Sequence, residues 1–97
     1  MTLEELRKFK PQIQALAREY KIDPDSIRVF GSVARGNNTV TSDVDFLIKP
    51  LKGCSIFDIS AFHEDTGSML NCEVDVVSER AILPAMQQSI FGDAVNL

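Results

Sequence analysis

The chain has 97 residues, of which 44% are hydrophobic and 25% charged, and its net charge is −4. It has no run of Lys and Arg that would bind a phosphate backbone and no apolar stretch near the roughly 20 residues of a membrane span, which argues against a direct nucleic-acid ligand and a membrane partner. We expect one cytoplasmic domain over residues 1–97, too small to add a separate module that grips a large substrate.

The amino-terminal segment is typical of helix. Thr2 followed by Glu5 predicts a capping box, and apolar residues then recur at helical spacing as far as Tyr20. Pro11 interrupts this pattern, so it either kinks one long helix or starts a second one. We expect the apolar stripe to pack in the core.

Residues 27–30 form a short apolar run after a turn-forming segment, which predicts a buried strand. Gly31 and Ser32 end this strand, and residues 33–35 form the first turn of a short helix. Glycine lets a backbone approach a phosphate closely, and the Ser32 hydroxyl can donate a hydrogen bond to it. Arg35 lies one turn later on the same face, where it can add a charge-assisted contact.

After an expected loop over residues 36–42, the segment from Asp43 to Lys49 has the periodicity of a strand. Its positions Val44, Phe46 and Ile48 alternate with Asp43, Asp45, Leu47 and Lys49. Asp43 and Asp45 occupy positions i and i+2, so their side chains project from one face about 6–7 Å apart. Such a pair suits Mg²⁺, which takes oxygen ligands and leaves positions for water or substrate phosphates. The sequence therefore predicts a metal site on this strand.

Ser55 and Asn71 predict the start and end of a further helix, and residues 73–77 predict a strand with Asp75 on the face opposite its valine neighbours. Asp75 supplies a third carboxylate, and Glu73, which has the same parity, is the alternative. Three convergent carboxylates can hold two metal ions for in-line attack at phosphorus. Asp75 would then bind the second ion or act as a general base.

The remaining features predict structure rather than chemistry. A last helical region is interrupted by Pro84, and residues 94–97 can add a small strand. Cys54 and Cys72 match no zinc motif, and His63 is the single histidine, so we expect reduced thiols and a surface imidazole. One α+β domain accounts for this order of elements.

Two segments resemble a known family. Residues 31–36 (Gly-Ser-Val-Ala-Arg-Gly) and 42–46 (Ser-Asp-Val-Asp-Phe) are similar to the signature of the polymerase-beta superfamily, in which ten residues separate Gly-Ser from Asp-x-Asp, as they do here. The short chain and the Gly-Ser-x-Ala-Arg-Gly form resemble the minimal nucleotidyltransferase (MNT) group, which places its third acidic residue at the position of Asp75.

The resemblance implies a polymerase-beta-like nucleotidyltransferase fold, with a small, mixed, twisted sheet backed by helices, that binds ATP and two Mg²⁺ ions. In this group Gly31 and Ser32 would hold the β- and γ-phosphates. Asp43 and Asp45 would bind both metal ions, and Asp75 would bind the ion nearer the acceptor.

The resemblance also implies a function. Many such short proteins resemble the antitoxins of HEPN–MNT toxin–antitoxin pairs, in which the MNT protein attaches AMP to a tyrosine of the HEPN ribonuclease and silences it. We therefore expect a Mg-ATP-dependent antitoxin with a HEPN-type toxin as its partner. Two alternatives stay open: an antitoxin that masks its toxin sterically without turnover, and nucleotidyl transfer to a small molecule or an RNA end.

Overall fold

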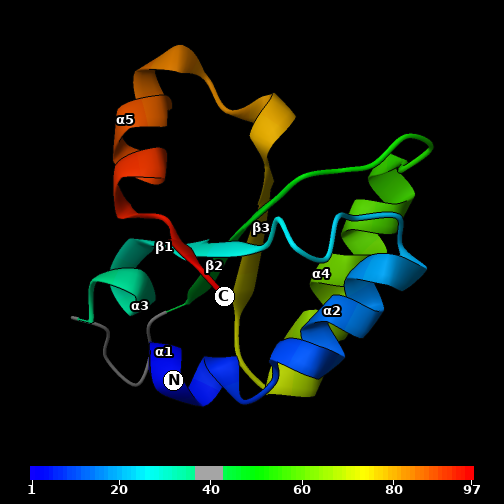
Figure 1. The fold of residues 1–97 in the computed structure, drawn as a ribbon, viewed down its shortest axis with the longest axis horizontal. Coiled ribbons are helices and arrows are strands. Elements are labelled where there is room, and N and C mark those ends of the chain that lie inside the picture. Colours follow the sequence, from blue (N-terminus) through cyan, green and yellow to red (C-terminus); the bar gives the residue numbers. More distant parts are fainter. Residues whose placement is uncertain (37–42) are drawn as a thin grey trace.

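The computed structural model describes residues 1–36 and 43–97, so most of the loop expected over residues 36–42 lies outside the described part of the chain. Along the chain the elements are α1 (Leu3–Arg7), α2 (Lys10–Glu19), β1 (Arg28–Phe30), α3 (Gly31–Arg35), β2 (Val44–Ile48), α4 (Ile56–Leu70), β3 (Val74–Ser78), the 3-10 helix η1 (Glu79–Ala81), α5 (Pro84–Asp93) and β4 (Val95–Asn96) (Figure 1).

The strands of the described residues form one mixed sheet in the order β3-β2-β1-β4. β1 runs antiparallel to both β2 and β4, whereas β2 and β3 are parallel. α4 joins the two parallel strands, which need a long crossover connection of this kind. The α+β class and the small mixed sheet backed by helices are thus confirmed.

The main core lies between the sheet and the helices α2 and α4, which lie side by side in Figure 1. Phe46 and Ile48 of β2 point into this core, where Phe46 packs edge-on against Phe62 of α4 with ring centroids 6.4 Å apart. Leu47 points to the other face and packs with Ile90 in a smaller cluster beneath α5. Because side chains alternate along a strand, β2 contacts helices on both faces of the sheet.

Local sequence signals account for the helix ends. Thr2 Oγ1 accepts a hydrogen bond from the Glu5 amide at 3.1 Å, and Ser55 forms a reciprocal capping box at the start of α4. Pro11 lies in the first turn of α2, so it belongs to the start of a second helix, the second of its two predicted roles. Asn71 ends α4 in the left-handed conformation, with a φ of 53°.

Some boundaries differ from the predicted ones. β2 begins at Val44, so Asp43 precedes the strand instead of opening it. β3 runs from Val74 to Ser78, one residue later than predicted at each end, and α3 already begins at Gly31. Pairing between β2 and β3 starts at Val44 and Val74, so the hydrogen-bonded ladder sets these ends. None of the helices in the described ranges combines the length and the apolar character of a membrane span.

Candidate functional site

Two of the predicted aspartates lie on neighbouring strands. Asp45 of β2 and Asp75 of β3 are register partners in the parallel pair, so their side chains lie on the same face of the sheet. This face also carries Leu47 and the cluster beneath α5, while Val74 packs on the α4 side. Asp45 is half-buried and Asp75 is exposed. Strand pairing therefore brings together two carboxylates that are distant in sequence.

The backbone of Gly31 lies directly against the Asp45 side chain. Phe30, the last residue of β1, pairs with Asp45 across the antiparallel ladder, which places the β1–α3 turn beside the carboxylate. Gly31 has a φ of +76°, and a Cβ added there would collide with the Asp45 carboxylate, 3.2 Å from its Cγ. Glycine adopts a positive φ readily and has no Cβ, so the Gly31–Ser32 turn can adjoin the aspartate pair.

The surroundings of Asp45 favour its protonated form. Burial, followed by the negative charges of Asp75 and Asp43, raises the pKa of Asp45 to about 6. Hydrogen bonding between the Asp45 and Asp75 side chains acts in the same direction, whereas the guanidinium of Arg35 lowers this pKa. The face thus carries an excess of negative charge that a cation would relieve.

The third predicted carboxylate, Asp43, is exposed and lies immediately before β2. Its charge acts on Asp45, yet among residues 1–36 and 43–97 no three His, Cys, Asp or Glu side chains are arranged so that they could hold a metal ion. The pair of Asp45 and Asp75 still matches the chemistry of Mg²⁺, because it supplies oxygen ligands and a repulsion that a divalent cation neutralises. The residues present therefore fit such an ion, with Asp43 at the edge.

Arg35, the predicted phosphate ligand, forms an ion pair that the sequence did not predict. Its Nη1 lies 2.5 Å from Oδ2 of Asp93 at the end of α5, and the Arg35 side chain remains 47% exposed. No motif marks Asp93, because the contact depends on how α5 folds back onto α3. Ser32, the other predicted polar residue of this turn, is half-buried in the first turn of α3.

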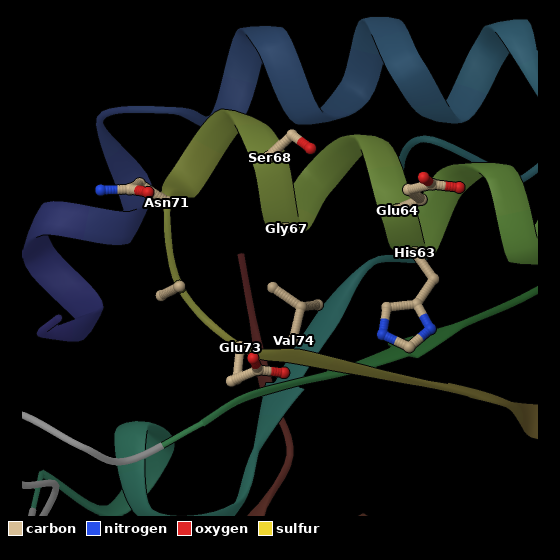
Figure 2. A pocket seen from close by; sticks show the side chains of 8 residues that line it. His63, Glu64, Gly67, Ser68, Asn71, Glu73 and Val74 are labelled. Atoms are coloured by element: carbon tan, nitrogen blue, oxygen red, sulfur yellow. The ribbon is translucent and has the colours of Figure 1, made fainter.

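A pocket of about 520 Å³ lies between β3 and α4 (Figure 2). Glu73, the predicted alternative to Asp75 as the third carboxylate, lines this pocket. The register partner of Asp45 is instead Asp75. His63 also lines it and is exposed, as predicted. Cys72 lines the pocket as well, and both Cys54 and Cys72 are free thiols, in agreement with the sequence.

Known proteins are similar to this chain in sequence and in fold. The family described as the nucleotidyltransferase domain matches residues 6–95. The chain belongs to this family. It is 32% identical over 95 residues to the Methanocaldococcus jannaschii protein named "Putative protein adenylyltransferase MJ0126", a match that covers 97% of this chain and 92% of that protein. A second protein from the same organism, "Putative protein adenylyltransferase MJ0435", is 33% identical to this chain over 69 residues. This match covers 71% of this chain and 74% of that protein.

Solved structures match this nucleotidyltransferase-family chain along most of its length. The structure of a "putative minimal nucleotidyltransferase" superposes with a TM-score of 0.85 at 32% identity and covers 100% of this chain and 97% of that chain. A toxin–antitoxin crystal structure with AMP-PNP gives a TM-score of 0.74 at 21% identity, with 90% and 70% covered. The complex of a tri-AMPylated Shewanella oneidensis HEPN toxin with MNT antitoxin gives a TM-score of 0.68 at 18% identity. This match covers 93% of this chain and 69% of that chain. The predicted MNT-type fold is therefore confirmed.

Proposed function

We propose that this nucleotidyltransferase transfers AMP from ATP to a hydroxyl group of a partner protein. We propose further that the partner is a HEPN-type toxin, that a tyrosine receives the AMP, and that the modification neutralises the toxin. The observation that carries the proposal is the register pairing of Asp45 with Asp75 beside the Gly31 turn. This arrangement gives the sheet one face on which a triphosphate and an acceptor oxygen can lie next to each other.

The similar proteins support a protein acceptor. The M. jannaschii relatives are named for adenylyl transfer to protein. Among the structural neighbours, one toxin–antitoxin complex contains AMP-PNP, and another contains a tri-AMPylated HEPN toxin with its MNT antitoxin. Because this chain shares their fold, we assign it the same classes of substrate and partner.

The proposed roles follow from where the residues lie. The Gly31 backbone and the Ser32 hydroxyl bind the β- and γ-phosphates, next to Asp45. Asp45 and Asp75, with Asp43 at the edge, would hold two Mg²⁺ ions, whose charge stabilises the transition state of phosphoryl transfer. With cations bound, the carboxylates of this chain would orient the triphosphate, and the cation charge would offset the repulsion between them.

In the transfer step the acceptor hydroxyl oxygen forms a bond to the α-phosphorus, and the bond from this phosphorus to the oxygen of the β-phosphate breaks. Pyrophosphate leaves, and the hydroxyl proton passes to the exposed carboxylate of Asp75. The guanidinium of Arg35 acts on the charge of Asp45, so it also contributes positive potential near the phosphates.

Intact-mass spectrometry of the partner tests this proposal. The protein is incubated with Mg-ATP and the proposed HEPN-type partner, and the mass of that partner is followed. We expect a gain in steps of one AMP. Asp45→Asn should slow the gain on the order of a thousandfold, because it removes charge stabilisation from the transition state. No gain with the wild-type protein would show that the proposed reaction is wrong.

A double substitution separates transfer from steric masking. The Asp43→Asn, Asp45→Asn variant keeps the size of both side chains, so it should still bind the toxin yet fail to neutralise its ribonuclease activity in the presence of Mg-ATP. Asp25→Asn, which changes an exposed carboxylate in the turn before β1, is the matched control and should behave as the wild type. Neutralisation by the double variant at the wild-type dose would favour masking.

A further inference from the structure

The outer strand of the sheet has an edge that is open to a further strand. β3 lies at one end of the sheet and, within the described residues, pairs only with β2. The backbone N–H and C=O groups on its other side are therefore available to an added strand. The pocket between α4 and β3, which we call the α4–β3 pocket, lies beside this strand (Figure 2).

The lining of the α4–β3 pocket favours a cationic side chain. Gly67 contributes no side chain to the α4 wall, and the imidazole of His63 extends from α4 toward the strand (Figure 2). Glu64 and Glu73 supply two carboxylates, and the described lining contains no Lys or Arg. A volume of about 520 Å³ with this charge has room for the long side chain of a lysine or an arginine.

Alternation along β3 relates the α4–β3 pocket to the aspartate pair. Val74 packs on the α4 side of the sheet, whereas Asp75 lies on the same face as Asp45. A strand added to β3 would alternate in the same way, with one side chain on the pocket side and the next on the Asp75 side. One short segment can therefore fill the pocket and present a neighbouring side chain to the carboxylates.

We propose that the open edge of β3 binds an extended segment of the acceptor protein by strand addition. In this segment a Lys or Arg side chain enters the α4–β3 pocket, and the adjoining residue carries the hydroxyl that receives AMP. The inference rests on the proposed AMP transfer and specifies how the acceptor is recognised. Backbone pairing supplies the affinity, and the pocket supplies the sequence preference.

Synthetic peptides test this binding mode. The probe is a short peptide of alternating Thr and Val with a central Lys-Tyr pair, and its matched variants carry Glu-Tyr or N-methylated backbone amides. An NMR titration should show that the Lys-Tyr peptide shifts the amide signals of residues 74–78 and binds about fivefold more tightly than the Glu-Tyr peptide. N-methylation should abolish binding. Equal affinity for the Lys-Tyr and Glu-Tyr peptides, no binding, or shifts confined to other elements would overturn the inference.

Two substitutions alter the α4–β3 pocket itself. Gly67→Gln fills it, and the variant should fold because a Cβ at Gly67 makes only an ordinary contact, 3.5 Å from the Cys72 carbonyl oxygen. Glu64→Gln removes one carboxylate and should lower the affinity for the Lys-Tyr peptide by up to about fivefold. Glu19→Gln, an exposed carboxylate on α2 outside the pocket, is the matched control and should leave the affinity unchanged.

AMP transfer to the partner protein distinguishes the two ways in which the combined proposals can fail. If the two pocket variants modify the partner at the wild-type rate while Asp45→Asn does not, strand addition is wrong and the proposed function stands. If the wild-type protein transfers no AMP while NMR still places the Lys-Tyr peptide on β3, the proposed reaction is wrong and binding at the edge stands.

Discussion

Gly31 is subject to two independent constraints. Its φ of +76° lies in the left-handed region, and the Asp45 carboxylate occupies the space that a side chain would need. The second constraint arises because Phe30 and Asp45 are paired across β1 and β2, so the turn begins beside the carboxylate. The residue that gives the backbone its freedom is thus also the residue that lets this turn adjoin the aspartate pair.

Gly31→Ala should therefore impair both folding and nucleotide binding. A residue with a Cβ in the left-handed region costs about 1–2 kcal/mol, and the contact with Asp45 adds to this cost, so we expect a loss of about 2 kcal/mol or more in the free energy of unfolding. Urea denaturation measures this loss, and calorimetric titration with Mg-ATP should show weakened binding in the variant.

Gly92 offers the matched control for this substitution. It lies in α5 without a positive φ, and a Cβ there would meet nothing within 4 Å. Gly92→Ala should raise the free energy of unfolding by about 0.5–1 kcal/mol, because alanine is the better helix former. If Gly31→Ala were as stable as the wild type and bound Mg-ATP equally well, the two constraints on Gly31 would be refuted.

At the scale of elements, α5 connects the second face of the sheet to α3. Ile90 of α5 packs with Leu47 beneath the helix, and Asp93 at its end pairs with Arg35. The ion pair thus holds the side chain of Arg35 at the end of the helix that begins with the Gly31–Ser32 turn. We therefore expect α5 to influence the proposed phosphate site through this ion pair.

A double-mutant cycle on Arg35 and Asp93 tests this connection. If Asp93 positions Arg35, Arg35→Ala and Asp93→Asn should each weaken Mg-ATP binding about threefold to fivefold, as expected for an exposed ion pair. The double variant should bind Mg-ATP no more weakly than either single variant, because the two substitutions remove the same interaction. Glu79→Gln disrupts the ion pair with Arg28 and is the control, with unchanged affinity expected. Fully additive losses in the cycle would contradict a positioning role for Asp93.

Local patterns predicted the elements better than their boundaries and contacts. The caps at Thr2 and Ser55 and the apolar alternation of β2 gave helices and strands because they act through near neighbours in the chain. Asp43 fell outside its predicted strand because β2 begins where pairing with β3 begins. The contact of Asp93 with Arg35 could not be predicted, since it forms only when α5 packs on α3.

At the scale of the whole molecule, the fold half-buries Asp45 beside other carboxylates at a cost to its own stability. The folded-state pKa of Asp45 is about 6, above the ordinary value of 3.8, so the folded state binds more protons than the unfolded state between these values. This group therefore adds stability as the pH falls from about 7 to about 4 and removes it as the pH rises. Near neutral pH the remainder of the fold must compensate for burying the charged Asp45 carboxylate beside Asp75 and Asp43.

Replacing Asp45 with Asn should consequently stabilise the metal-free protein, although the same substitution slows the proposed transfer. In EDTA near pH 7 we expect a gain of about 1 kcal/mol after solvent screening, or a rise of about 4–8 °C in Tm, with no difference near pH 4. Mg²⁺ should then raise the Tm of the wild type alone, because only the folded wild type binds it. Asp25→Asn should match the wild type both in EDTA and with Mg²⁺, in thermal unfolding followed by circular dichroism. A wild type as stable as the Asn variant in EDTA at neutral pH would mean that burial and the neighbouring carboxylates do not destabilise the charged form of Asp45.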